Sequence, residues 1–245
     1  MKFRLIHGDC FKVLPQLVDE GVKVDMMFLD LPYNETGNNW DKKDMNYRIL
    51  FRYLRELITD EGAILFTGTF KHGVKLYTAC PELYKYEWVW VKDNGTNIPN
   101  VNYQPFRVHE YIYVFGKGRV SYGKRTPMKY YPQKTRGTPY NQFNSPNNKK
   151  KWKGGMNQTQ TINKGDRHPH TVQFFKRDRG YHPTQKPVKM IEYFIKTYTD
   201  ENNIVLDCTM GSGSTGVACK NLNRNFIGIE LDEHYYHVAE SRIKK

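Results

Sequence analysis

The sequence predicts an α/β protein built on a doubly wound, mostly parallel sheet. Apolar runs with the length of a buried strand alternate along the chain with segments that show helical periodicity. Near the C-terminal end, a glycine-rich turn joins a strand-like run to a helix-like one, an arrangement that places ligands at the carboxyl edge of such sheets. At 245 residues the chain is long enough to bury a full core.

The first half of the chain alternates between strand-like and helix-like patterns. The continuous apolar run VDMMFLD, at 24–30, is typical of a strand that is buried on both faces. Helical spacing of leucine and isoleucine follows, and Gly62 then marks an expected helix end. In order, we expect a strand at 3–9, a weak helix at 11–21, a strand at 24–30, a helix at 46–62, a strand at 63–69, and two strands at 85–92 and 110–118 that pair antiparallel.

Regular alternation returns after residue 180. Pro187 is placed to open a helix, because its fixed φ suits the first helical turn. Asp232 is placed to cap another helix, since its side chain can accept a hydrogen bond from a free backbone N–H. In order, we expect a helix that begins at Pro187, a strand at 203–208, a helix at 213–223, a strand at 225–230 and a helix from Asp232 to the last residue.

Residues 116–180 break this pattern and carry the excess charge of the chain. They hold 16 of the 38 Lys and Arg residues but only two of the 25 acids, Asp166 and Asp178. Pro, Gly, Asn and Lys dominate, so we expect an inserted module or a set of long loops. Positive charge in one internal block that also contains aromatic side chains favours contact with nucleic acid over a solvated basic tail.

The composition disfavours several other classes of protein. No apolar run approaches the ~20 residues that cross a bilayer, and His7 and Asp9 interrupt any signal-peptide core. We therefore expect a cytoplasmic protein without membrane contact. The four cysteines form no C-x-x-C pair, so we expect neither a metal site nor a disulfide framework.

The glycine-rich turn VLDCTMGSGSTG, at 205–216, carries the first chemical signal. Its glycines fit G-x-G-x-x-G, and Glu230 closes the next strand where an acid can bind ribose hydroxyls, so a nicotinamide-dependent oxidoreductase is one alternative. Asp207 argues against it, because a carboxylate beside this turn would repel the pyrophosphate of a dinucleotide. S-adenosylmethionine carries an ammonium and a sulfonium instead, and an anion at this position favours both.

The second chemical signal is the motif DLPY, which follows an apolar run. An exocyclic amine of adenine or cytosine is a poor nucleophile, because its lone pair is delocalised into the ring. Asp30 and a backbone carbonyl of Leu31 or Pro32 would accept hydrogen bonds from its two N–H groups and hold the nitrogen pyramidal. Pro32 would stiffen the turn, and Tyr33 would stack on an extruded base. If the strands before Asp30 and Asp207 are neighbours, both loops face one pocket.

With these motifs, the chain resembles the amino-methylating DNA methyltransferases. DLPY resembles their catalytic motif IV, usually Asp-Pro-Pro-Tyr, while LDCTMGSGSTG resembles motif I, FIGIE motif II, HGD motif III and HPTQKP motif X. The catalytic motif precedes the basic segment and the cofactor loop comes last, which is the circularly permuted order of the β class. The resemblance covers essentially the whole chain and implies a Rossmann-like methyltransferase fold. It implies three regions: a catalytic half at 1–115, a basic target-recognition insert at 116–180, and a cofactor-binding half at 181–245.

Carried over by position, the resemblance also implies the residues of the site. Asp30, Pro32 and Tyr33 would be catalytic. The residues that would bind S-adenosylmethionine are Asp9, Cys10, His182, Thr184, Lys186, Asp207, Gly211, Ser212, Gly213, Ser214, Thr215 and Glu230. The chain departs from the family pattern at two places, because Leu31 replaces the first proline of motif IV and Cys208-Thr209 stands where Pro-Phe is usual.

The expected reaction is methyl transfer from S-adenosylmethionine to a base that is flipped out of double-stranded DNA. Cytosine C5 methylation needs a cysteine nucleophile in a Pro-Cys dipeptide, and the chain has none. Family members whose motif IV begins with Asp mostly resemble adenine enzymes, so Asp30 favours adenine N6, with cytosine N4 as the alternative. A nucleic-acid-binding protein that keeps the fold without activity is a further alternative. Dimers are common in families of this resemblance, and the sequence leaves monomer or homodimer open.

Overall fold

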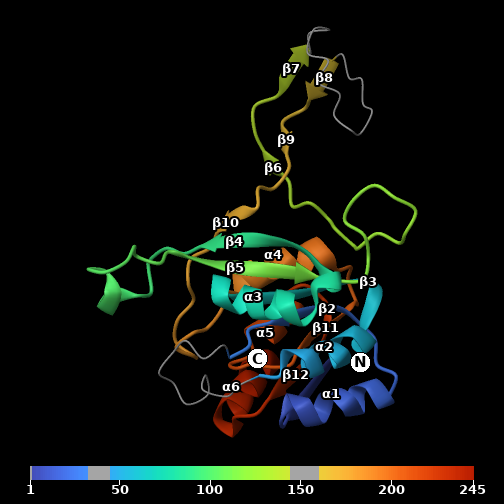
Figure 1. Cartoon of the computed structure of the whole chain (residues 1–245), viewed down its shortest axis with the longest axis vertical. Coiled ribbons are helices and arrows are strands. Elements are labelled where there is room, and N and C mark those ends of the chain that lie inside the picture. Colours follow the sequence, from blue (N-terminus) through green and yellow to red (C-terminus); the bar gives the residue numbers. More distant parts are fainter. Residues whose placement is uncertain (1, 33–44, 144–159) are drawn as a thin grey trace. The chain divides into compact units, whose positions relative to one another are not determined.

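The computed structural model describes residues 2–32, 45–143 and 160–245 of the chain. Its helices and strands divide between two compact units, residues 1–131 with 171–245, and residues 132–170. The larger unit contains an eight-stranded sheet with helices on both faces, as Figure 1 shows. The described residues of the smaller unit form two short antiparallel ribbons. This architecture confirms the predicted α/β class with a mostly parallel sheet.

The strands of the large sheet come from all parts of the larger unit. In sequence order they are β1 (Phe3–His7), β2 (Val24–Leu29), β3 (Ile58–Gly68), β4 (Tyr84–Val91), β5 (His109–Phe115), β10 (Val172–Phe174), β11 (Ile204–Asp207) and β12 (Asn225–Glu230). Their order in the sheet is β1-β12-β11-β2-β3-β5-β4-β10. Only β5 runs against its neighbours, and its antiparallel pairing with β4 confirms the prediction for that pair.

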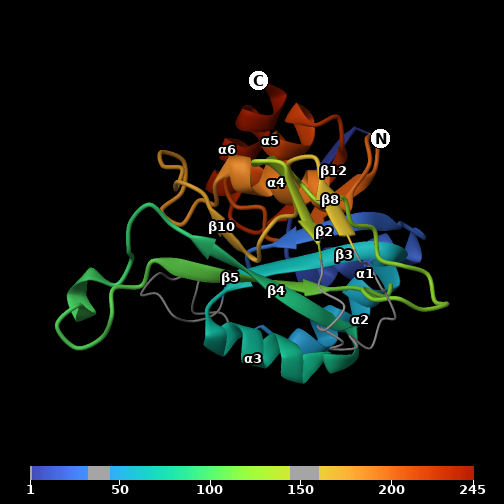
Figure 2. The same cartoon turned by 90° about the horizontal axis from the view of Figure 1, so that it is seen from above.

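In the described part of the chain, six α-helices cover the two faces of this sheet. They are α1 (Cys10–Asp19), α2 (Tyr47–Leu57), α3 (Phe70–Ala79), α4 (Val188–Tyr198), α5 (Ser214–Asn221) and α6 (Glu233–Lys244). Figure 2 shows α1, α2 and α3 on one face and α4, α5 and α6 on the other. The sheet is therefore doubly wound, and strand order reverses between β11 and β2, which lie side by side.

Strand β2 illustrates why the central strands are apolar throughout. Met27 and Leu29 belong to the core beneath α1, α2 and α3, whereas Met26 and Phe28 belong to the core beneath α4, α5 and α6. All four side chains are almost completely buried. Because successive side chains of a strand point to opposite faces, a strand covered on both sides needs apolar residues at every position.

Four of the described helices begin with a side-chain cap, and the caps are Asp9, Asn46, Thr69 and Asp232. Asp9 accepts a hydrogen bond from the backbone N–H of Phe11 at the start of α1, at 2.9 Å. Asp232 accepts one from Tyr235 at 3.0 Å, as its predicted capping role at α6 requires. Asn46 caps α2 in the same way through Ile49, at 3.2 Å. Such contacts satisfy backbone donors that the first helical turn leaves without partners.

Helices α2 and α3 both differ from the sequence prediction. The helix expected at 46–62 ends at Leu57, and Ile58 already begins β3, where it pairs with Val24 of β2. Tertiary pairing therefore overrides the helical spacing that continues through this isoleucine. Helix α3 is not predicted by the sequence pattern, because Gly73 lowers its helix propensity. That glycine lies under the ring of Tyr113, whose Cζ would be 2.1 Å from an added Cβ atom.

The predicted insert at 116–180 is divided between the two units. Tyr131 donates its backbone N–H to the carbonyl of Thr197 at 2.7 Å, and the carbonyl of Thr171 accepts from Val89 at 2.8 Å. The chain is thus hydrogen-bonded to the large unit directly before and after residues 132–170. Residues 172–174 then form β10, the edge strand of the large sheet. The separate compact unit covers 132–170, which is narrower than the predicted insert.

The small unit is held by its own hydrogen bonds. Its ribbons pair β6 (Thr135–Arg136) with β9 (Asp166–Arg167), and β7 (Tyr140–Phe143) with β8 (Gln160–Asn163). The guanidinium of Arg167 lies over the Tyr140 ring at 5.1 Å and donates to Asn163 Oδ1 at 2.5 Å. Lys149, Lys150 and Lys151 of the basic segment lie outside the described residues. Among the helices that are described, none combines the length and the apolarity needed to cross a membrane.

Candidate functional site

The two acids singled out by the sequence lie at the ends of neighbouring strands. Asp30 directly follows β2, and Asp207 is the last residue of β11. These strands pair in parallel, with Leu206 opposite Met27, so both acids lie at the same carboxyl edge of the sheet. The two loops also touch, because the Thr209 hydroxyl donates to the backbone carbonyl of Asp30 at 3.2 Å. The arrangement places both loops at the point where strand order reverses, which is where open α/β sheets bind ligands.

The glycine turn after β11 is held by carboxylates. Glu230, at the end of β12, accepts the backbone N–H of Gly211 at 2.7 Å. Asp207 accepts the backbone N–H of Thr209 at 3.1 Å and the hydroxyl of Thr215 at 2.6 Å. Gly211 has φ +51° and an added Cβ there would meet nothing within 4 Å, so this turn leaves open space in front of its backbone.

A cavity of about 560 Å³ opens between these loops. Apolar atoms form most of its wall surface, and five carboxylates reach the wall against one lysine and one histidine. The carboxylates are those of Asp9, Asp30, Asp207, Glu230 and Asp232. The volume suits a small organic ligand, and the charge favours a cation and disfavours a pyrophosphate.

Burial changes the protonation of two of these acids. It raises the pKa of Asp207 to about 7, and the nearby carboxylates of Asp30 and Glu230 raise it further. Hydrogen bonds from Thr215 and Thr209 act in the opposite direction, because they stabilise the charged form. Burial also raises the pKa of Glu230 above its ordinary value. A cationic ligand beside these groups would stabilise their ionised forms and would lower both pKa values.

Asp30 is held by two donors from distant parts of the chain. The Thr67 hydroxyl, at the end of β3, donates to Oδ1 at 2.5 Å, and the Lys186 ammonium donates to Oδ2 at 2.7 Å. Lys186 also lies 3.7 Å from Oε2 of Glu110, which forms a second ion pair with Lys92. Because a carboxylate offers about four acceptor sites, Asp30 keeps acceptor capacity for a ligand in the cavity.

The segment before α4 forms one wall of the cavity. His182 Nδ1 accepts the backbone N–H of Thr184 at 3.1 Å, and its ring packs against Tyr235 with centroids 4.4 Å apart. Burial lowers the pKa of His182, so the imidazole is neutral near pH 7. Lys186 therefore supplies the charge of this wall, beside the turn that carries Asp30.

One departure from the family pattern has a local consequence. Cys208, which stands where a proline is usual, contacts the thiol of Cys10 across the cavity wall. This contact, together with burial, raises the pKa of the Cys208 thiol well above its ordinary value. Both cysteines are buried and reduced, and the raised pKa keeps the Cys208 thiol protonated at neutral pH.

The structure brings nearly all of the sequence-predicted site residues to this cavity. Gly213 is an exception, because it lies off the wall and its Cα packs against Ala239 of α6. Tyr33 lies outside the described residues. The predicted site residues that line the cavity are Asp9, Cys10, Asp30, Pro32, His182, Thr184, Lys186, Asp207, Gly211, Ser212, Ser214, Thr215 and Glu230.

Sequence reasoning missed the residues that surround Asp30 from other strands. Thr67 and Glu110 lie at the same sheet edge because β3 ends there and β5, which is antiparallel, begins there. A polar residue at the end of the apolar run AILFTGT was the available signal for Thr67. The predicted antiparallel pair did not say which of its two strands runs against the rest of the sheet, and the structure shows that it is β5. In the described part of the chain, no three His, Cys, Asp or Glu side chains form a group that could hold a metal ion.

Comparison with known proteins agrees with this geometry. A family model described as DNA methylase matches residues 24–241. The chain is 28% identical to the type II methyltransferase M2.LlaDCHI of Lactococcus lactis subsp. cremoris over 98% of this chain and 89% of that protein. It is 26% identical to the type II methyltransferase M2.DpnII of Streptococcus pneumoniae over 99% and 90% of the two chains.

Two solved structures share the fold. The crystal structure of M1.HpyAVI superimposes with a TM-score of 0.67 at 24% identity and covers 99% of both chains. The cytosine-N4-specific PvuII DNA methyltransferase superimposes with a TM-score of 0.67 at 12% identity, over 99% of this chain and 86% of that one. The matched family region includes both strand ends, the glycine turn and the wall segment described above.

Proposed function

This chain belongs to the N6/N4 family of DNA methylases, and from that premise we propose that it transfers the methyl group of S-adenosylmethionine to adenine N6 in double-stranded DNA. The observation that carries the proposal is the opening of the Asp30 turn and the glycine turn onto one cavity, with the Thr209 hydroxyl bonded to the Asp30 carbonyl. A methyl group can pass between two ligands only if their sites share such a space.

The cavity fits the proposed cofactor by size and by charge. When bound, S-adenosylmethionine supplies an electrophilic methyl group on a sulfonium. Asp207 and the turn at 211–215 would hold its cationic methionine part, and Glu230 would accept hydrogen bonds from ribose hydroxyls. Asp9 and Cys10 would meet the adenine, while His182, Thr184 and Lys186 would lie near the carboxylate. The five carboxylates on the wall argue against the phosphates of a nicotinamide dinucleotide.

Asp30 and Pro32 would orient the target amine. The Asp30 carboxylate accepts one N–H hydrogen bond, and a carbonyl of the stiff Leu31-Pro32 turn accepts the other, so the nitrogen lone pair points toward the methyl group. Thr67 and Lys186 keep both oxygens of Asp30 fixed by hydrogen bonds. A prealigned acceptor of this kind lowers the barrier because little reorganisation is needed in the transition state.

The choice of adenine is supported by the first residue of the catalytic motif. Asp30 occupies the position where family members that methylate adenine mostly carry Asp. Tyr33 would supply a stacking surface for the extruded base. The basic segment 116–180 would contact phosphates and base edges of the duplex, with arginine and lysine suited to guanine and asparagine and glutamine suited to adenine.

The test is methylation of a whole genome in vitro, followed by sequencing of the modified positions. The expected result is transfer of label from methyl-labelled S-adenosylmethionine to adenine N6 within one short sequence, and no transfer by Asp30→Ala. Label at cytosine N4 would reject adenine while leaving the reaction class intact. Cofactor binding without label in any DNA would reject methyl transfer and favour a binding protein.

A further inference from the structure

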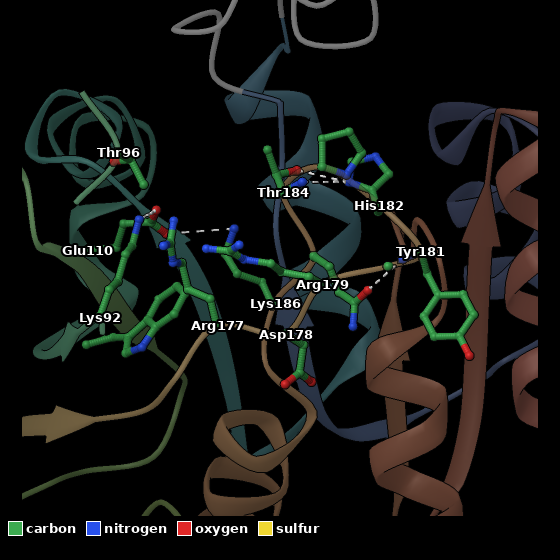
Figure 3. A pocket seen from close by; sticks show the side chains of 14 residues that line it. Lys92, Thr96, Glu110, Arg177, Asp178, Arg179, Tyr181, His182, Thr184 and Lys186 are labelled. Carbon is green, nitrogen blue, oxygen red and sulfur yellow. Dashed lines mark hydrogen bonds and ion pairs between the residues drawn. The ribbon is translucent and has the colours of Figure 1, made fainter. Parts of the chain in front are cut away.

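A second cavity of about 570 Å³ adjoins the first at the same sheet edge (Figure 3). The two cavities share one wall, formed by His182, Thr184, Gln185 and Lys186. The far side of the second cavity is formed by the end of β4, the start of β5 and the segment 177–181. It therefore begins on the other side of the lysine that binds Asp30.

The second cavity carries charge of the opposite sign to the first. Four cationic side chains reach its wall, namely Lys92, Arg177, Arg179 and Lys186, against the two carboxylates of Glu110 and Asp178. Those two carboxylates are already engaged. Glu110 pairs with Lys92 and Lys186, and Asp178 accepts the backbone N–H of Val188 at 2.9 Å. Arg177 is paired with Asp93, which lies outside the cavity wall, so Arg179 supplies the cationic charge that has no carboxylate partner among the described residues.

These arginines keep donors available. Arg177 is oriented by Asp93, which accepts both its backbone N–H at 3.1 Å and its Nε–H at 3.2 Å. Its terminal amino groups make no hydrogen bond to another described residue, and the exposed Arg179 side chain makes no hydrogen bond or ion pair within the described part of the chain. Two guanidinium groups with unused N–H donors match the oxygens of a phosphate.

We propose that this cavity binds the backbone phosphate next to the nucleotide whose base is methylated, through Arg177 and Arg179. The inference rests on the proposed function, because a base flipped out of the duplex keeps its flanking phosphates and carries them toward the active site. The charges of the two cavities match different ligands, because the anionic cavity suits the cationic cofactor and the cationic cavity suits the anionic DNA backbone. Lys186 separates them and remains bound to Asp30 and Glu110.

The test couples a change in the protein with a change in the DNA. Duplexes that carry the mapped methylation site are made with one phosphate at a time replaced by a neutral methylphosphonate, and binding is measured with wild type, Arg179→Gln and Arg177→Gln. Arg52→Gln is the matched control, since Arg52 is an exposed cation on α2 that lines neither cavity. Thermal shift with S-adenosylmethionine verifies that each variant folds and binds the cofactor.

The expected result is a loss of about ten- to a hundredfold in affinity when the wild type meets the methylphosphonate adjacent to the target base. Arg179→Gln and Arg177→Gln should each lose affinity for unmodified DNA and lose little more with that methylphosphonate. With Arg52→Gln, the methylphosphonate should cost as much as it costs the wild type. Each of the two cavity variants should also lower the slope of log affinity against log salt by about one.

Two outcomes would overturn the inference. In the first, each methylphosphonate costs the arginine variants as much affinity as it costs the wild type. In the second, the cost differs between variants and wild type only at phosphates remote from the target base. Either result is compatible with normal methyl transfer by the wild type, so it would leave the proposed function standing. Failure of the proposed function is separately visible as absence of label on unmodified DNA.

Discussion

The Lys186 ammonium lies 2.7 Å from Oδ2 of Asp30, although 156 positions separate the two residues. Glu110 lies on the other side of this lysine, at 3.7 Å, and pairs in turn with Lys92. The sheet edge therefore carries a row of alternating charges that begins at the proposed acceptor of the target amine. Because the side chains of Lys92, Glu110 and Lys186 are largely buried, loss of one member leaves its neighbours uncompensated.

Asp30→Asn should reduce methyl transfer at least about a hundredfold, because an amide accepts weakly from the target amine and loses the ion pair with Lys186. S-adenosylmethionine binding, followed by thermal shift, should change little. Asp19→Asn on the exposed end of α1 is the control for the same chemical change. Equal initial rates for Asp30→Asn and the wild type would exclude Asp30 from the chemistry.

Glu110→Ala should destabilise the fold by about 3 kcal/mol, since Lys92 is buried and would lose its carboxylate partner. The double variant Glu110→Met with Lys92→Met should recover most of this loss, because it removes both charges of the pair. The measurement is the free energy of unfolding from urea denaturation at pH 7. A double variant that is as unstable as Glu110→Ala would show that the ion pair is not the cause.

The same residue predicts a dependence on pH. Burial alone would raise the pKa of Glu110, but Lys186 and Lys92 outweigh it and hold the pKa below its ordinary value of 4.5. A pKa that is lower in the folded protein than in the unfolded chain stabilises the fold at pH values above 4.5. This stability is lost as the pH falls through the pKa of the folded protein. The stability difference between wild type and Glu110→Gln should therefore be constant at neutral pH and shrink in acid.

Asp207 predicts a pH dependence of cofactor affinity. Its pKa of about 7 means that a proton must leave the carboxyl below this pH before a cation can pair with it. The affinity for S-adenosylmethionine should rise by up to about tenfold per pH unit below 7 and level off above. Asp207→Asn should lack this rise. The measurement is the affinity for S-adenosylmethionine by calorimetry as a function of pH, in the wild type and in Asp207→Asn. Because the ligand itself titrates equally in both experiments, the difference between the two pH profiles reports Asp207.

The two glycines of the cofactor turn should respond differently to alanine. At Gly213, with φ +81°, an added Cβ would lie 2.8 Å from the Cβ of Ala239, so Gly213→Ala adds a steric clash to backbone strain. At Gly211, with φ +51°, only the strain remains. We expect losses of about 3 kcal/mol for Gly213→Ala and about 1 kcal/mol for Gly211→Ala. Thermal denaturation of the two variants without cofactor checks the order.

The ends of two central strands could be located from the sequence, because an apolar run there gives way to a charged residue. Asp30 and Asp207 each terminate an apolar run, and the parallel class then brings such ends to one edge. Their actual adjacency required the strand order, which a single sequence does not contain. The contact between Asp30 and Lys186 is likewise a product of that order, since nothing local in either segment specifies the other.

Elements that form only through pairing with distant strands could not be predicted from the sequence pattern. Strand β10 has three residues, too few for a period, and exists because Gln173 pairs with Trp90 of β4. The start of β3 at Ile58 was hidden by helical spacing and is set by its pairing with Val24. In both cases the local preference is weak and the sheet decides the conformation.

The hydrogen bonds at Tyr131 and Thr171 have an evolutionary consequence. They fasten the chain to the large unit immediately before and after residues 132–170. All eight strands of the large sheet lie outside the stretch between these two anchors, so we expect a change in its length to leave the hydrogen bonds of that sheet in place. If this stretch reads the DNA as proposed, its exchange would change the sequence that is read, while Asp30 and the glycine turn would stay the same.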